Sequence, residues 1–255
     1  MPRLIKTPKE IALLVEGGKR LAFVLGEVAA AVAPGVTTRE LDARAERLIR
    51  KQGGTSSFKG YRSRKAQTPY PATLCTSVND EIVHAIPSER ILREGDIIGL
   101  DIGMVWEGLY TDTALTAPVG TIAARARALI DATKKALEIG IAQVREGATT
   151  GDIGAAIEQF LQRRGFGVVR ELVGHGVGYT VHEDPEVPNW GTPGAGVRLE
   201  KGMVLALEPM ATEGASDIVL AKDGWAWKTK DGSISAHFEH TIVVEKGGAR
   251  VLTFA

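Results

Sequence analysis

Four carboxylates and one imidazole lie in or beside apolar stretches typical of β-strands, and this combination limits the fold more than any other feature of the chain. Asp101 closes the run DIIGLD, and Glu208 closes the run MVLALE. Burying several carboxylates is prohibitively costly unless cations neutralise them. An oxygen-rich set with a single imidazole suits two hard or borderline divalent ions, which can activate water for hydrolysis. The candidate metal ligands are Asp101, Asp112, His175, Glu208 and Glu239.

The chain also contains an internal repeat. Residues 34–53 (PGVTTRELDARAERLIRKQG) and 146–165 (EGATTGDIGAAIEQFLQRRG) share a glycine at the second position, a Thr-Thr pair and a final glycine. Each segment opens with a threonine that can cap a helix and an acidic residue for the first turn, and each follows a longer amphipathic stretch. The two segments therefore predict two equivalent helices that end at glycine.

The strands after these helices repeat as well, because GDIIGLD at 95–101 aligns with GMVLALE at 202–208. We therefore predict a single domain over 1–255 with two pseudo-symmetric halves, roughly 1–115 and 120–255. Two unrelated helix–strand modules of similar composition are the alternative. In a duplicated fold, carboxylates from both halves would meet at a central pseudo-twofold axis, which is a natural place for two metal ions.

Composition excludes several classes of protein. Lys plus Arg and Asp plus Glu number 31 each, so the net charge is zero and nothing calls for nucleic acid or an anionic membrane. Cys75 is the one cysteine, which rules out an internal disulfide and fits a reducing cytoplasm. No apolar run approaches the roughly 20 residues of a membrane span, and the N-terminus lacks the apolar core of a signal peptide. We expect a cytoplasmic, monomeric protein.

Several short motifs together resemble the type I methionine aminopeptidases of bacterial type, in peptidase family M24. They occur in the order and spacing of that family over nearly the whole chain. In chain order they are CTSVNDEIVH (75–84), LDIG (100–103), TDT (111–113), GHGVG (174–178), HEDP (182–185), LEPM (207–210), DGW (223–225) and SAHFEH (235–240). The resemblance implies an α/β (α+β) "pita-bread" fold, in which helices flank a curved, mainly antiparallel sheet. It also implies removal of the initiator methionine from new polypeptides whose second residue is small.

The resemblance further implies a role for each candidate ligand. Asp112 and Glu239 would bridge two divalent ions, His175 and Glu208 would complete the shell of one ion, and Asp101 that of the other. Cobalt, manganese, iron(II) and zinc all accept this ligand set. Glu208 would also carry the water proton to the leaving amine.

Substrate contacts follow from the same resemblance. His182 would stabilise the tetrahedral intermediate, and His84 would hydrogen-bond the leaving peptide nitrogen. Tyr70, Cys75 and Trp225 would line the methionine pocket.

The resemblance also suggests a monovalent cation near Asn79 and Ser235. The partner would be a peptide that begins with methionine. Transient contact with the ribosome is a further expectation, and a small basic cluster, Arg62, Arg64 and Lys65, lies in the segment 59–69, to which no role is assigned.

Simpler interpretations remain for single residues. Any one carboxylate alone could cap a helix or pair with a cation, and His84 could be a core histidine. His240 adjoins Glu239 but should point to the opposite side of its strand, so a structural role is expected. Cys75 lies in an apolar strand and is expected to be a small buried hydrophobe rather than a nucleophile.

Two other functions compete. An Xaa-Pro aminopeptidase or prolidase has the same metal centre but usually carries a large N-terminal domain, for which we expect no room before residue 10. A non-catalytic binding module on the same fold usually loses metal ligands, and all five candidates are present here.

Overall fold

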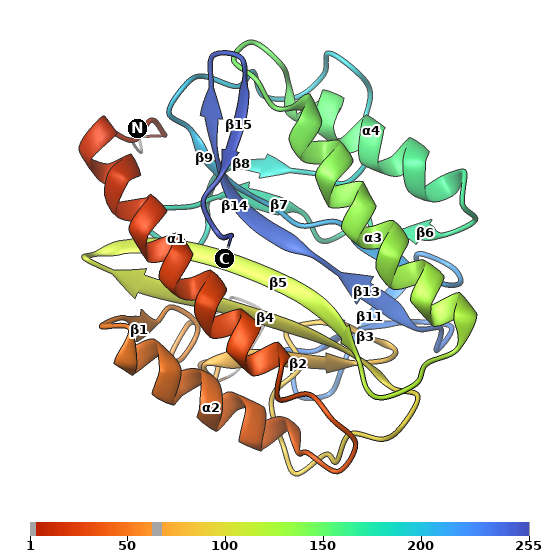
Figure 1. Ribbon diagram of the computed structural model, residues 1–255. Helices are drawn as coiled ribbons and strands as arrows, with labels where there is room; N and C mark the ends of the chain where they lie inside the picture. The colour runs from red at the N-terminus through yellow and green to blue at the C-terminus, as the bar shows by residue number, and fades with distance from the viewer. Residues whose placement is uncertain (1–3, 63–67, 255) are drawn as a thin grey trace.

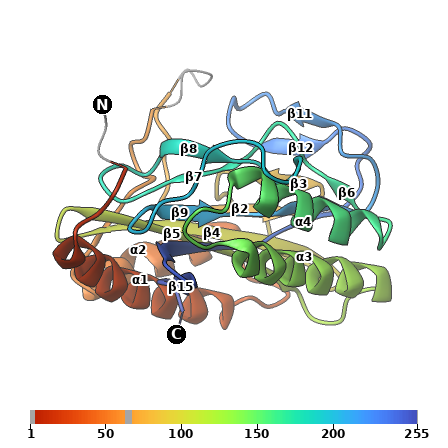
Figure 2. The ribbon, with the colours of Figure 1, turned by 90° about the horizontal axis from the view of Figure 1, so that it is seen from above.

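The computed structural model describes residues 4–62 and 68–254, so Arg64 and Lys65 of the basic cluster lie outside the described residues. Four helices lie on one side of a large sheet, and shorter strands lie on its other side (Figures 1 and 2). The helices are α1 (Pro8–Ala29), α2 (Thr38–Lys51), α3 (Ala124–Gln143) and α4 (Thr150–Gln162). Among the described residues, none of the helices combines the length and the hydrophobicity of a membrane span.

The large sheet is antiparallel and contains nine of the described strands. Seven follow the order β1-β4-β5-β14-β9-β7-β8, while β2 pairs with β4 and β15 pairs with β14. Its strands are β1 (Thr55–Ser56), β2 (Leu74–Val78), β4 (Ile97–Trp106), β5 (Leu109–Pro118), β7 (Gly174–Gly176), β8 (Glu183–Val187), β9 (Val204–Leu207), β14 (Glu239–Glu245) and β15 (Gly248–Val251). This curled antiparallel sheet flanked by four helices confirms the predicted pita-bread fold.

Two smaller sheets lie beside the large one. The first contains β6 (Gly167–Val168), β10 (Met210–Thr212) and β13 (Ser235–His237). The second contains β3 (Glu81–Val83), β11 (Ile218–Leu220) and β12 (Trp227–Thr229).

The repeated helices begin as predicted. In α2, Thr37 and Glu40 form a reciprocal capping box, and Thr149 and Asp152 do the same for α4. Each threonine hydroxyl accepts a hydrogen bond from the backbone N–H three residues later, and the acidic side chain accepts one from the threonine N–H. Both N–H groups lie at the start of the helix, where they have no partner within it. The equivalent strands β4 and β9 also flank the central pair β5–β14 symmetrically. These matches agree with a duplicated chain, and the division of a single domain into two halves stays a prediction.

The two faces of the sheet differ in chemistry. In β4, the alternate residues Ile98, Leu100, Ile102 and Met104 are buried in one apolar cluster with residues of α1 and α2. In the other half, Leu205, Leu207, Ile242 and Val244 belong to a cluster with residues of α3 and α4. Because side chains alternate along a strand, the intervening residues face away from the helices.

Glycines let β7 fit between β8 and β9. A Cβ on Gly174 would lie 2.4 Å from the Ala206 carbonyl oxygen, and one on Gly176 would lie 2.1 Å from the Asp184 carbonyl oxygen. Both distances are far below a van der Waals contact, so only glycine permits this approach of backbones. The GHG sequence therefore places His175 in a closely packed strand.

Gly176→Ala is expected to lower the free energy of unfolding by about 1–3 kcal/mol, because backbone atoms must shift to admit the methyl group. Gly26→Ala on α1 is the matched control, because a Cβ there meets nothing within 4 Å. Alanine in a helix should stabilise by about 0.5–1 kcal/mol. Chemical denaturation of both variants measures the difference, and equal stability of the two would contradict the packing described here.

Candidate metal centre and active site

Strand register brings the five candidate ligands to one face of the sheet. In the β4–β5 hairpin, Asp101 pairs with Ala114 and Gly103 pairs with Asp112, so both carboxylates face the same way. Glu239 at the start of β14 also pairs with Ala114, which places it on the face of Asp101 and Asp112. Since paired residues share a face in an antiparallel sheet, all three point away from the helices.

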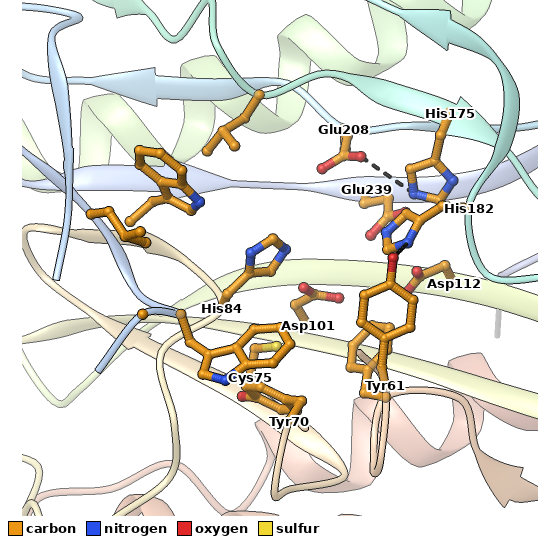
Figure 3. Close-up of a pocket in the computed structure, with 16 residues that line it drawn as sticks. Tyr61, Tyr70, Cys75, His84, Asp101, Asp112, His175, His182, Glu208 and Glu239 are labelled. Carbon is orange, nitrogen blue, oxygen red and sulfur yellow. Dashed lines mark hydrogen bonds and ion pairs between the residues drawn. The ribbon is translucent and has the colours of Figure 1, made fainter. Parts of the chain in front are cut away.

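The other two candidate ligands, His175 and Glu208, reach this face by the same rule. Ala206 in β9 pairs with Thr241 of β14 and with His175 of β7. Thr241 is two residues after Glu239, so His175 shares the face of the carboxylates. Glu208 follows two residues after Ala206, immediately beyond the end of β9. Figure 3 shows the four carboxylates and His175 pointing into one cavity.

The ligand atoms are close enough to share a metal. Single ligand atoms of Asp112, His175 and Glu239 all lie within 4.8 Å of one another. Glu208 Oε1 is 3.5 Å from His175 Nε2. Oδ1 of Asp101 and Oε1 of Glu239 are buried with no hydrogen-bond partner among the described residues. Buried carboxylate oxygens without donors need a cation, so these residues fit a divalent metal.

Burial controls the protonation of the site. It raises the pKa of Asp101 to about 7 and the pKa of Glu208 to about 8. Burial and the neighbouring carboxylates raise the pKa of Asp112 and Glu239 well above the ordinary range. The pKa of His175 falls to about 3 because burial and the nearby His182 disfavour its charge, which leaves a lone pair for a metal.

Two further histidines flank the carboxylates. His84, in the left-handed region with φ 62°, lines the cavity, and burial next to His182 and His237 lowers its pKa to about 4. His182 stacks edge-on against His175, with 4.5 Å between ring centroids. Its Nδ1 lies 2.9 Å from the hydroxyl of Tyr61. Both neutral rings can therefore donate a hydrogen bond into the cavity.

The cavity continues from the carboxylates into an apolar and aromatic space, and its volume is about 300 Å³. The three predicted pocket residues all line it. Tyr70 and Trp225 meet edge to face at 5.1 Å between centroids, and Cys75 is buried beside them. Burial and the Asp101 charge raise the pKa of the Cys75 thiol well above its ordinary value, so the thiol stays protonated, as expected for a residue that is not a nucleophile.

Sequence analysis missed three residues at the site. Phe58 and Tyr61 line the cavity from the segment before residue 63, and no local pattern marks them. His237 is buried, and its Nε2 lies 3.5 Å from Glu208 Oε2. Its spacing of two residues from Glu239 would signal a shared face within one strand, but the two residues lie in different strands, β13 and β14. His240 instead bonds Thr253 Oγ1 at 3.0 Å, which agrees with its expected structural role.

Comparison with known proteins decides the family. A family model described as "Metallopeptidase family M24" matches residues 12–246. The chain is 42% identical to methionine aminopeptidase 1 of Bacillus subtilis over 250 residues, which are 98% of each protein. It superimposes on the crystal structure of methionine aminopeptidase from Thermotoga maritima with a TM-score of 0.95 and 42% identity, covering both chains completely. The chain belongs to the methionine aminopeptidases of family M24.

Proteins with other specificities are similar to the chain in fold at lower sequence identity. The X-Pro aminopeptidase from Thermotoga maritima gives a TM-score of 0.77 at 19% identity, and the chain covers 62% of its length. Membership in a metallopeptidase family and the buried Asp–His–Glu group together give the enzyme a divalent metal site.

The metal-free enzyme should lose stability as pH rises from about 6.5 to 8. Asp101 and Glu208 keep their protons in the folded state to about pH 7 and 8, whereas unfolded carboxyls lose theirs near 4. The folded state thus binds more protons in this window, and raising the pH costs on the order of 1 kcal/mol per unit for each proton. The lowered pKa values of His84 and His175 affect the pH dependence of stability only below the ordinary histidine pKa of about 6.5.

Calorimetry of chelator-stripped protein at both ends of this window, with and without Mn²⁺, measures the effect. Added Mn²⁺ should raise the melting temperature most at the higher pH, because the ion then displaces fewer protons. Stripped protein that is more stable at the higher pH would contradict the burial of these carboxyls.

Proposed function

We propose that this methionine aminopeptidase removes the N-terminal methionine from peptides whose second residue is small. It would use two divalent ions bound by the five candidate ligands on one face of the sheet. The methionine aminopeptidase activity follows from the family. The proposed substrate and metal binding have one main support. Three buried carboxylates, the half-buried Glu208 and a neutral imidazole lie directly beside an apolar, aromatic cavity. This arrangement suits a peptide whose first side chain is apolar and whose first carbonyl lies over the metal ligands.

The proposed ligand roles follow the family. Asp112 and Glu239 lie on the central pair of strands and would be shared by both ions. His175 and Glu208 would complete the shell of one ion, and Asp101 that of the other. The ions, which can be cobalt, manganese, iron(II) or zinc, would supply Lewis acidity and a water molecule of lowered pKa.

Glu208 is our proposed proton carrier. Its carboxylate sits between two imidazoles, 3.5 Å from His175 Nε2 and 3.5 Å from His237 Nε2. Burial raises its pKa to about 8, so it can hold a proton taken from the nucleophilic water and pass it to the leaving amine. A carboxyl with an ordinary pKa would be a poorer acid at neutral pH.

His182 and His84 are the proposed hydrogen-bond donors. When the Tyr61 hydroxyl donates to Nδ1 of His182, the neutral ring carries its proton on Nε2. That proton would stabilise the oxyanion of the tetrahedral intermediate. His84 reaches the cavity from the opposite half of the chain and would contact the leaving nitrogen (Figure 3).

Tyr70, Cys75 and Trp225 would bind the methionine side chain. A flexible thioether packs well against aromatic edges and a polarizable sulfur. The Tyr70 hydroxyl lies 3.1 Å from the Leu74 carbonyl oxygen and 3.0 Å from that of Ala85, so its ring is held at the pocket wall.

The remaining expectations are part of the same proposal. A monovalent cation would lie at Asn79 and Ser235, where the Ser235 hydroxyl is 3.2 Å from the Asn79 carbonyl oxygen and 3.0 Å from that of Glu81. The enzyme would act in the cytoplasm, because its substrates are new polypeptides, and it would contact the ribosome transiently. We expect it to be a monomer.

Initial rates on Met-Gly-Met-Met and Met-Leu-Met-Met test the specificity. Chelator-stripped enzyme given back Mn²⁺ or Co²⁺ should release methionine from the first peptide and spare the second. An Xaa-Pro peptide in parallel tests the competing relatives. Cleavage of that peptide alone would replace the proposal, and no cleavage of any peptide by folded, metal-loaded protein would favour a binding module.

His182→Ala is expected to lower turnover of Met-Gly-Met-Met by about 10–1,000-fold, because one donor to the oxyanion is lost. Metal stoichiometry, measured by plasma mass spectrometry, should stay at the wild-type value. His240→Ala is the matched control, since His240 faces Thr253 and does not line the cavity. Unchanged turnover in His182→Ala would remove this residue from the mechanism.

A further inference from the structure

A buried lysine lies beside the segment that carries His182. Lys6 is only 3% exposed, and its Nζ lies 2.5 Å from Oε2 of Glu183. The same ammonium group sits over the ring of Tyr179, 4.6 Å from the centroid. An ammonium group is rarely buried unless a carboxylate compensates it, so Lys6 and Glu183 depend on each other.

The Glu183 carboxylate organises the loop between β7 and β8, which we call the His182 loop (residues 177–182). Its Oε1 accepts the backbone N–H of Tyr179 and, at 2.9 Å, that of Thr180. The Thr180 hydroxyl then donates to the His182 carbonyl oxygen at 2.9 Å. One oxygen of Glu183 therefore accepts two backbone hydrogen bonds from the loop, while the other binds the lysine.

Lys6 reaches this loop from a separate segment. Figure 2 shows the chain before α1 running from the level of β7 and β8 past the sheet to the helix side. The backbone N–H of Lys6 donates to the Gly202 carbonyl at 2.9 Å, just before β9, which leads to Glu208. Gly178, with φ 141°, leaves room for the lysine stem, because a Cβ there would lie 2.4 Å from Lys6 Cε.

We propose that Lys6 is a positioning residue for catalysis: by neutralising Glu183 it holds the His182 loop in the arrangement that presents the His182 ring to the substrate. The inference rests on the proposed role of His182. Lys6 itself does not line the cavity, so it acts only through the loop. Without the ammonium group, a largely buried carboxylate with side-chain exposure of 10% would draw water or move outward, and the loop would follow it.

Steady-state kinetics of Lys6→Met on Met-Gly-Met-Met test the proposal. We expect kcat to fall about 10–100-fold, which is the scale of a displacement of about 1 Å in a catalytic group. KM should change much less, and metal stoichiometry should match wild type. Lys9→Met is the matched control, because Lys9 lies three residues further on in the first turn of α1 and is exposed, and it should keep wild-type kinetics.

The decisive comparison uses the His182→Ala background. If Lys6 acts through His182, adding Lys6→Met to His182→Ala should cause little further loss of kcat. An equal loss in both backgrounds, or wild-type kinetics in Lys6→Met alone, would overturn the proposal. Should Lys6→Met not fold, Glu183→Gln and the double variant Lys6→Met/Glu183→Gln carry the same test. The double variant should recover part of the lost kcat, since it leaves no buried charge unpaired.

Ring signals of the histidines give a readout that needs no activity and no metal. The chain has five histidines, so ¹H–¹⁵N spectra of the imidazoles are readily assigned by single replacements. Lys6→Met should shift the His182 ring signals, and Lys9→Met should not. If wild-type enzyme is inactive, or His182→Ala keeps full turnover, the proposed function has failed instead. If both behave as proposed and the His182 signals stay in place in Lys6→Met, only the role of Lys6 has failed.

Discussion

The whole structure depends on the mutual repulsion and desolvation of four carboxylates that share one face of a sheet. These carboxylates are too close together and too poorly hydrated to be ionised together without a cation; they are Asp101, Asp112, Glu208 and Glu239. The fold accommodates them by separating its two faces. Helices and aliphatic side chains cover one face, and every ligand stands on the other. A metal ion is therefore part of the energetics of this fold as well as of its chemistry.

The central pair β5–β14 has the largest influence on that arrangement. It joins β5, from the N-terminal part of the chain, to β14, from the C-terminal part, and each contributes a carboxylate that we propose both ions would share. A slip of one residue at this pair would turn Glu239 toward the helices and His240 toward the cavity. The register is fixed by apolar residues on the helix face, so hydrophobic packing determines the geometry of a polar site.

Much of this could be predicted from the sequence, because the decisive signals are local. Apolar, strand-like runs mark Asp101 and Glu208, which close them, and the Thr-x-x-acid spacing marks two of the helix starts, with both capping boxes present. The motifs that resemble the family add the pocket residues. Tyr61, His237 and Lys6 were not found, because their roles depend on contacts with residues far away in the chain. Lys6 and Glu183 are 177 positions apart, and no periodicity connects them.

The central pair β5–β14 also determines when the site can form during synthesis of the chain. Strands β1 to β5 leave the ribosome long before Glu239, and until then Asp101 and Asp112 lack the partner strand that completes their site. Domains commonly fold as units while the chain emerges, but pairing between distant strands must wait for the later one. The growing chain is thus without a complete metal centre for most of its own translation. The N-terminal and C-terminal parts of the chain complete the site together, at the moment when β14 pairs between β5 and β9.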